Sequence, residues 1–152
     1  YADGHDLAGL DLAKVAEVPA MCLDRRGNTS IDIDAADLAG ARGAAVLIRT
    51  DHSLRWSTDA YFTDHPHLTA ASARALVECG VACVGIDSLN IDSTATGDRP
   101  VHSILLGAQI PIVEHLTGLH HLPPNGFTFT AVPPRIEGAG TFTVRAFATL
   151  AD

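Results

Sequence analysis

The sequence has few basic residues and no cluster of them. Lysine and arginine together number 10 in 152 residues, against 18 aspartates and glutamates, and the formal net charge is −8. Binding to phosphate groups needs clustered Lys and Arg, so this composition argues against nucleic acid and against anionic membrane surfaces as partners. No apolar run reaches the roughly 18 residues of a membrane-spanning helix. We also find no basic segment followed by an apolar stretch that would mark a signal peptide.

Cysteine is also scarce, and the three present are Cys22, Cys79 and Cys83. Their number is odd and their spacing fits no disulfide framework, so we predict reduced core thiols in a cytoplasmic protein. Cys79 and Cys83 form C-x3-C, whereas a structural zinc site usually has C-x2-C pairs. We therefore disfavour a structural zinc ion at these cysteines.

Apolar residues are plentiful at 47 % of the chain, which is enough for one globular domain with a real core, residues 1–152. Short apolar strands alternate with short helical patterns, which predicts an α/β fold with a mixed sheet and short flanking helices. A turn at 25–28 suggests a hairpin between strand 18–24 and a returning strand at 29–33. The remaining expected strands are 44–50, 81–87, 109–116, 127–134 and 141–150, and the expected helices are 35–40, 70–79 and 102–106. Asp34 and Thr69 are the expected N-terminal caps of the first two helices, which we expect to end at Gly40 and Gly80.

Residues 51–68 have no clean period, and loops of this length are usually functional or mobile. The aromatic residues Trp56, Tyr61 and Phe62 could line an apolar pocket for an aromatic substrate, or could be ordinary packing under the loop. His65-Pro66-His67 could bind a metal if it were a strand, but the proline favours an exposed turn.

Two charged residues end buried strands, where α/β folds place ligands. Asp87 could orient a ligand or cap the backbone of its own loop, and we favour the cap. Arg49 could pair with an internal carboxylate or anchor an anionic substrate.

His102 and Glu114 are good metal-ligand types separated by a helix, Gly107 and an apolar strand. A helix and a following strand packed antiparallel would return the chain to its starting edge, which can bring both side chains together. The alternative is two solvated residues at element ends. His115 should face away from Glu114, and the adjacent pair at 120–121 should lie on the surface.

Three consecutive stretches carry a family resemblance: VGIDSLNID, then PVHSILLGAQIPIVEHLTGLHHLPP, then GFTFTAVPPRIEGAGTFTVRAFA. They resemble the C-terminal part of the cyclase family of metal-dependent hydrolases, whose best-known members are bacterial kynurenine formamidases. The opening YADGHDLAGLDLAKV resembles the segment that follows the family motif H-x-G-T-H-x-D-x-P-x-H. That motif, which supplies further metal ligands and an acid/base histidine, has no counterpart here, so the catalytic residue is not assigned.

The resemblance implies a swivelling β/β/α fold and a divalent metal, zinc or manganese, with His102 and Glu114 among its ligands. It implies hydrolysis of a small-molecule amide or lactam C–N bond, as in N-formyl-kynurenine to kynurenine and formate in tryptophan catabolism, by a homodimer or tetramer. Trp56, Phe62 and Asp87 are the candidate substrate-pocket residues. Isatin or another cyclic amide is an alternative substrate, and a truncated, non-catalytic member is the alternative of another class.

Overall fold

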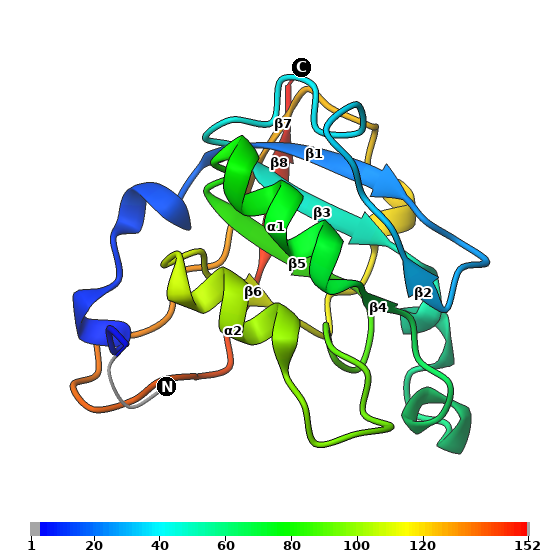
Figure 1. The fold of residues 1–152 in the computed structure, drawn as a ribbon. Helices are drawn as coiled ribbons and strands as arrows, with labels where there is room; N and C mark the ends of the chain where they lie inside the picture. Colours follow the sequence, from blue (N-terminus) through cyan, green and yellow to red (C-terminus); the bar gives the residue numbers. More distant parts are fainter. Residues whose placement is uncertain (1–3, 152) are drawn as a thin grey trace.

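The computed structural model describes residues 4–151, and its centre is a six-stranded sheet in the order β6-β5-β3-β1-β7-β8 (Figure 1). The four strands from β6 to β1 are mutually parallel, whereas β7 runs antiparallel to β1 and β8 antiparallel to β7. This arrangement confirms the predicted α/β fold with a mixed sheet. The strands are β1 (Val18–Asp24), β3 (Ala45–Arg49), β5 (Cys83–Ile86), β6 (Ile112–Val113), β7 (Phe127–Thr130) and β8 (Phe147–Leu150).

The predicted hairpin is wrong. β2 (Ser30–Ile31) pairs in parallel with β4 (His67–Leu68) and forms a separate two-stranded sheet. Both edges of β1 are already occupied, one by β3 and the other by β7, so no edge remains for a hairpin partner. The two isoleucines at 31 and 33 instead enter the core beside α1, where Ser72 Oγ accepts a hydrogen bond from the Ile33 amide at 2.8 Å.

The helix expected at 35–40 is a series of turns. Asp34 caps the segment as expected, because its Oδ1 accepts hydrogen bonds from the Ala36 and Asp37 amides. The segment is six residues long and ends at Gly40 with φ +82°. A helix this short gains too few hydrogen bonds to offset its nucleation cost.

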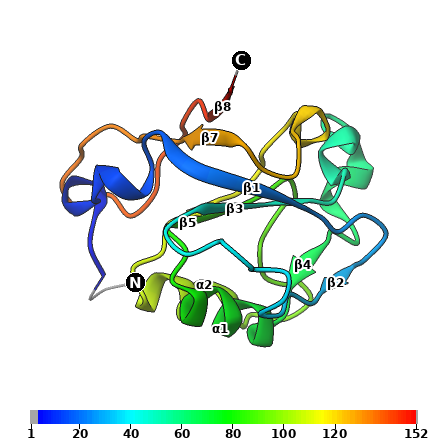
Figure 2. The same cartoon turned by 90° about the horizontal axis from the view of Figure 1, so that it is seen from above.

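Two helices cover one face of the sheet, α1 (Ala70–Cys79) and α2 (Pro100–Gly107) (Figure 2). Thr69 caps α1 by accepting from the Ser72 amide, and Gly80 ends it in the left-handed region, both as predicted. Pro100 occupies the first turn of α2, where a missing amide proton costs nothing. The helices and the sheet enclose the larger core, which includes Val46, Ile48, Leu76, Val84, Ile86, Ile91, Val101 and Leu105.

The opposite face carries a smaller core built on Leu47, Leu116, Leu119, Phe127 and Phe129.

Strands β6 and β8 are shorter than the apolar patterns at 109–116 and 141–150 suggested. Five 3₁₀ helices complete the described residues: η1 (Leu7–Gly9), η2 (Leu12–Lys14), η3 (His52–Arg55), η4 (Asp59–Phe62) and η5 (Leu119–His121). No helix within residues 4–151 has the length and apolarity needed to cross a bilayer.

Candidate functional site

Polar side chains gather where the four parallel strands end. β1 ends on Asp24, β3 leads into Thr50 and Asp51, β5 into Asp87, and β6 into Glu114. Parallel strands end at the same edge of a sheet, and ligands of α/β folds bind outside this edge.

His102 and Glu114 meet at this edge. His102 lies in the first turn of α2 and Glu114 directly follows β6, and the His102 Nε2 atom is 3.6 Å from Glu114 Oε1. Each side chain keeps about a fifth of its surface exposed, at 20 % and 23 %. The pair is therefore accessible from solvent rather than sealed in the core.

The loop between β5 and α2 holds both side chains in place. Asp92 Oδ2 is 2.7 Å from His102 Nδ1 and accepts a hydrogen bond from the His102 amide at 3.0 Å. The amide of the preceding residue, Ile91, donates to Glu114 Oε1 at 2.7 Å. Sequence reasoning missed Asp92, because the polar loop around it offers several carboxylates and no local pattern separates this one from Asp98.

The geometry of the pair fits two ligands of one cation. Two donor atoms bound tetrahedrally to zinc lie about 3.4 Å apart, close to the 3.6 Å between His102 Nε2 and Glu114 Oε1. Within the described part of the chain, no three His, Cys, Asp or Glu side chains converge as a metal site would require. These residues thus fit part of a metal site, and their role as ligands remains a prediction.

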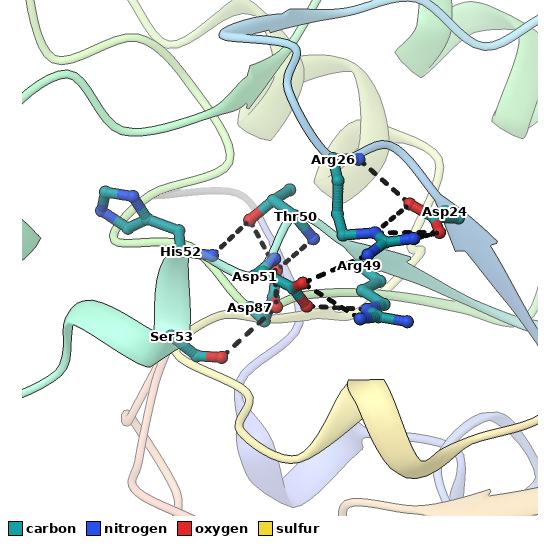
Figure 3. Close-up of polar contacts among 8 residues, drawn as sticks. All are labelled: Asp24, Arg26, Arg49, Thr50, Asp51, His52, Ser53 and Asp87. Carbon is teal, nitrogen blue, oxygen red and sulfur yellow. Dashed lines mark hydrogen bonds and ion pairs between the residues drawn. The ribbon is translucent and has the colours of Figure 1, made fainter.

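Asp87 is the polar hub of the neighbouring strand ends (Figure 3). Its carboxylate accepts from the Thr50 amide and hydroxyl, both at 2.7 Å, from the Asp51 amide at 3.0 Å and from the Ser53 hydroxyl at 3.3 Å. Burial raises the pKa of Asp87, while the hydrogen bonds, those from Thr50 first, oppose that rise. Since Asp87 is only 1 % exposed, these contacts give it a structural role. The backbone that it caps is the loop after β3, and not its own loop after β5 as predicted.

Arg49 pairs with a carboxylate, which was one of its two predicted roles. Its Nε and Nη2 atoms bind the two oxygens of Asp51 at 2.7 and 3.0 Å (Figure 3). This bidentate contact lowers the pKa of Asp51. Arg26 binds Asp24 in the same way, and its hydrogen bonds lower the pKa of Asp24 to about 2. The backbone of Asp51 lies in the left-handed region, with φ 60°.

The aromatic residues of the loop 51–68 differ in burial. Trp56 and Phe62 are 53 % and 67 % exposed, whereas Tyr61 is buried. A place for Trp56 and Phe62 in a substrate pocket therefore remains a prediction, whereas the Tyr61 side chain is enclosed by the protein. The Tyr61 hydroxyl is 2.8 Å from His115 Nδ1, and the Trp56 ring lies edge-on to the rings of Tyr61 and His115.

Two histidines of this loop are buried, one of them against prediction. His65 was expected in an exposed turn, but it is buried, with Nε2 3.0 Å from Thr94 Oγ1. Its burial lowers its pKa. His52 is also buried, and its Nε2 is 2.8 Å from the carbonyl oxygen of Tyr61. The pair at 120–121 is exposed, as predicted.

Comparison with known proteins places the chain in a family. The sequence model described as "Putative cyclase" matches residues 1–93, more than half of the chain. The chain belongs to the putative cyclase family. This confirms the resemblance stated from the sequence.

Individual relatives are hydrolases by name. The chain is 28 % identical over 151 residues to the kynurenine formamidase of Sphingopyxis alaskensis, covering 95 % of this chain and 68 % of that protein. It superposes on isatin hydrolase A from Ralstonia solanacearum with a TM-score of 0.83 at 25 % identity, covering 97 % of this chain and 65 % of that one. A solved structure called a potential metal-dependent hydrolase with cyclase activity gives 0.74 at 26 % identity, covering 91 % and 67 %. The chain thus spans about two thirds of the length of these relatives.

A cavity of about 280 Å³ in this cyclase-family chain lies beside Asp92, between the small sheet and the N-terminal ends of α1 and α2. It does not include Trp56 or Phe62. Its lining is formed by Ser30, His67, Leu68, Thr69, Ala70, Asp92, Ser93, Thr96, Asp98 and Pro100.

The cysteines of the cyclase-family chain are free thiols, as predicted. Burial raises the pKa of Cys83 to about 12 and that of Cys22 to about 11, so both stay protonated near neutral pH. The Cys79 thiol contacts the carbonyl oxygen of Leu38 rather than Cys83.

Proposed function

We propose that this protein is a metal-dependent hydrolase of an amide or lactam C–N bond. The proposal rests on one observation: His102 Nε2 lies 3.6 Å from Glu114 Oε1, at the edge where the parallel strands of this cyclase-family chain end. Relatives named kynurenine formamidase and isatin hydrolase support this reaction class, because both names describe hydrolysis of a C–N bond next to a carbonyl.

In this proposal His102 and Glu114 hold a divalent cation, zinc or manganese. A bound metal ion of this kind supplies a polarised carbonyl and a water whose pKa is about 7. Hydrolysis adds hydroxide to the carbonyl carbon, breaks the C–N bond and transfers one proton to the leaving nitrogen. Within the described residues, Asp92 and the Ile91 amide orient the two ligands, while Arg49 and Asp87 hold the adjoining strand ends.

N-formyl-kynurenine, which would give kynurenine and formate, is the first substrate we propose. Isatin, a cyclic amide, is the second, and the structural match to isatin hydrolase A is the observation that favours it. We further propose that the protein works in the cytoplasm as a homo-oligomer, dimer or tetramer. A non-catalytic cyclase-family chain is the remaining candidate, favoured by the incomplete ligand set within residues 4–151.

The test begins with metal content. The protein is purified with zinc or manganese, bound metal is measured by mass spectrometry, and both substrates are assayed. We expect His102→Ala and Glu114→Gln each to lower bound metal and hydrolysis together. The matched controls are His120→Ala and Glu78→Gln, which change the same residue types elsewhere and should leave both unchanged.

The outcomes separate the candidates. Bound metal with turnover of one substrate identifies that substrate. Bound metal without turnover of either favours the non-catalytic candidate. Metal content that is equal in wild type, His102→Ala and Glu114→Gln would refute the proposed ligands.

A further inference from the structure

We propose that Asp92 is the positioning residue of the candidate metal site, fixing His102 in the tautomer that carries its proton on Nδ1 and directs the free Nε2 lone pair at Glu114. The purpose of this arrangement rests on the proposed function. The contacts themselves involve only residues of this chain and can be tested without substrate.

The tautomer follows from the partners of the His102 ring. An ionised carboxylate only accepts hydrogen bonds, so the 2.7 Å contact with Asp92 Oδ2 requires a proton on Nδ1. A neutral ring then has no proton on Nε2. In the neutral ring Nε2 is then an acceptor 3.6 Å from a second acceptor, Glu114 Oε1, an arrangement that a cation between them would stabilise.

Asp92 is itself held rigidly. It is 1 % exposed, its Oδ1 accepts from the Val101 amide at 2.8 Å, and its Oδ2 accepts from the His102 amide at 3.0 Å. The same carboxylate thus closes the first turn of α2 and orients the ring that this turn carries. A carboxylate locked to the backbone in this way leaves the His102 ring little freedom to rotate.

The loop around Asp92 ties the two candidate ligands to one support. The Ile91 amide donates to Glu114, and the Ile91 side chain is fully buried in the larger core, between the helices and the sheet. Its carbonyl accepts from the Leu68 amide at 2.9 Å, which attaches the loop to β4. Ile91, which is anchored in the core, holds Glu114, and the next residue, Asp92, holds His102. The separation of His102 and Glu114 is therefore set before any ligand binds.

Two variants separate the ring contact from the helix cap. Asp92→Ser keeps a short oxygen that can cap a backbone amide of α2, but it cannot reach Nδ1. Asp92→Asn keeps one oxygen that can accept from Nδ1 while its NH₂ group replaces the oxygen that caps Val101. Asp34→Ser is the matched control, since Asp34 also accepts from two backbone amides, in a turn that contains no histidine.

The main measurement is a ¹H–¹⁵N correlation spectrum of the histidine rings in the metal-free protein at about pH 8, where an ordinary imidazole is neutral. His102→Gln assigns the signals by removing one set from the eight histidines. We expect wild type and Asp92→Asn to show His102 protonated on Nδ1, and Asp92→Ser to move it to the Nε2-protonated form. Asp34→Ser should leave the His102 signals unchanged.

A second measurement is zinc affinity by competition with a chromogenic chelator. Loss of a carboxylate behind a ligand histidine typically weakens metal binding by about 10–100-fold, and we expect that loss for Asp92→Ser against no change for Asp34→Ser. A wild-type His102 protonated on Nε2, or an Asp92→Ser spectrum and affinity equal to wild type, would overturn the inference.

These results are distinguishable from failure of the proposed hydrolase. A protein with the Nδ1-protonated His102 but no turnover refutes only the hydrolase proposal. A protein that hydrolyses its substrate with His102 protonated on Nε2 refutes only the role of Asp92.

Discussion

The imidazole Nε2 of His102 lies 3.6 Å from the carboxylate Oε1 of Glu114, although the rest of α2 and all of β6 lie between the two residues along the chain. Helix α2 leads the chain away from the edge where the parallel strands end, and β6 leads it back to the same edge. Four other features of the structure lead to predictions that do not depend on the proposed substrate. They are the buried Asp87, the contact between Tyr61 and His115, the buried His65, and Gly85, which lies close to two leucine side chains.

Replacing Asp87 with alanine should destabilise the protein by roughly 2–3 kcal/mol, because the buried amides of Thr50 and Asp51 lose a charged acceptor. Chemical denaturation followed by circular dichroism measures this loss. Asp98→Ala, at an exposed position, should stay within about 0.5 kcal/mol of wild type. Equal stability of both variants would mean that the Asp87 hub does not form in solution.

Replacing Tyr61 with phenylalanine should cost about 0.5–1.5 kcal/mol through loss of the hydrogen bond to His115 Nδ1. A double-mutant cycle with His115→Ala isolates that contact, because the hydroxyl should contribute nothing once its partner is gone. Additive effects of the two substitutions would contradict the contact.

The free energy of unfolding should fall as pH drops below about 6.5, the ordinary histidine pKa. Burial lowers the pKa of His65, so the unfolded chain binds a proton in this range before the folded chain does, and protonation favours unfolding. His65→Gln should reduce the difference in unfolding free energy between pH 7.5 and 5.5, whereas exposed His120→Gln should not. Asp24, Asp37 and Asp51 pair with Arg26, Arg25 and Arg49, and these contacts lower their pKa values. Their contribution to stability is lost only below about pH 3.8, in a separate window.

Replacing Gly85 with alanine should destabilise the sheet by about 1–3 kcal/mol. The added methyl carbon would lie 2.6 Å from Leu116 Cδ1 and 2.7 Å from Leu47 Cδ2, so both side chains must move. Since Leu116 follows Glu114 by two residues, we also expect weaker zinc binding. Gly107→Ala, at the end of α2 with open space around it, is the matched control and should not lower the thermal midpoint.

The sequence by itself determined the elements whose signals are local. Thr69 and Gly80 mark the two ends of α1 because capping and left-handed backbone depend on neighbouring residues alone. The apolar runs around 45–49 and 83–86 specify buried strands, and Pro100 and Gly107 bound α2. The approach of His102 to Glu114 was one of two possibilities left open by their spacing, and the packing of α2 and β6 decided it.

Only the tertiary structure decided the pairings and contacts between remote segments. β2 pairs with β4, more than thirty residues away, because β3 and β7 occupy both edges of β1. Burial of His65 and exposure of Trp56 depend on how one long loop lies against the strand ends. Asp92 resembles any other loop aspartate until α2 brings the His102 ring against its carboxylate, because hydrogen bonding depends on distance in space and not on spacing in sequence.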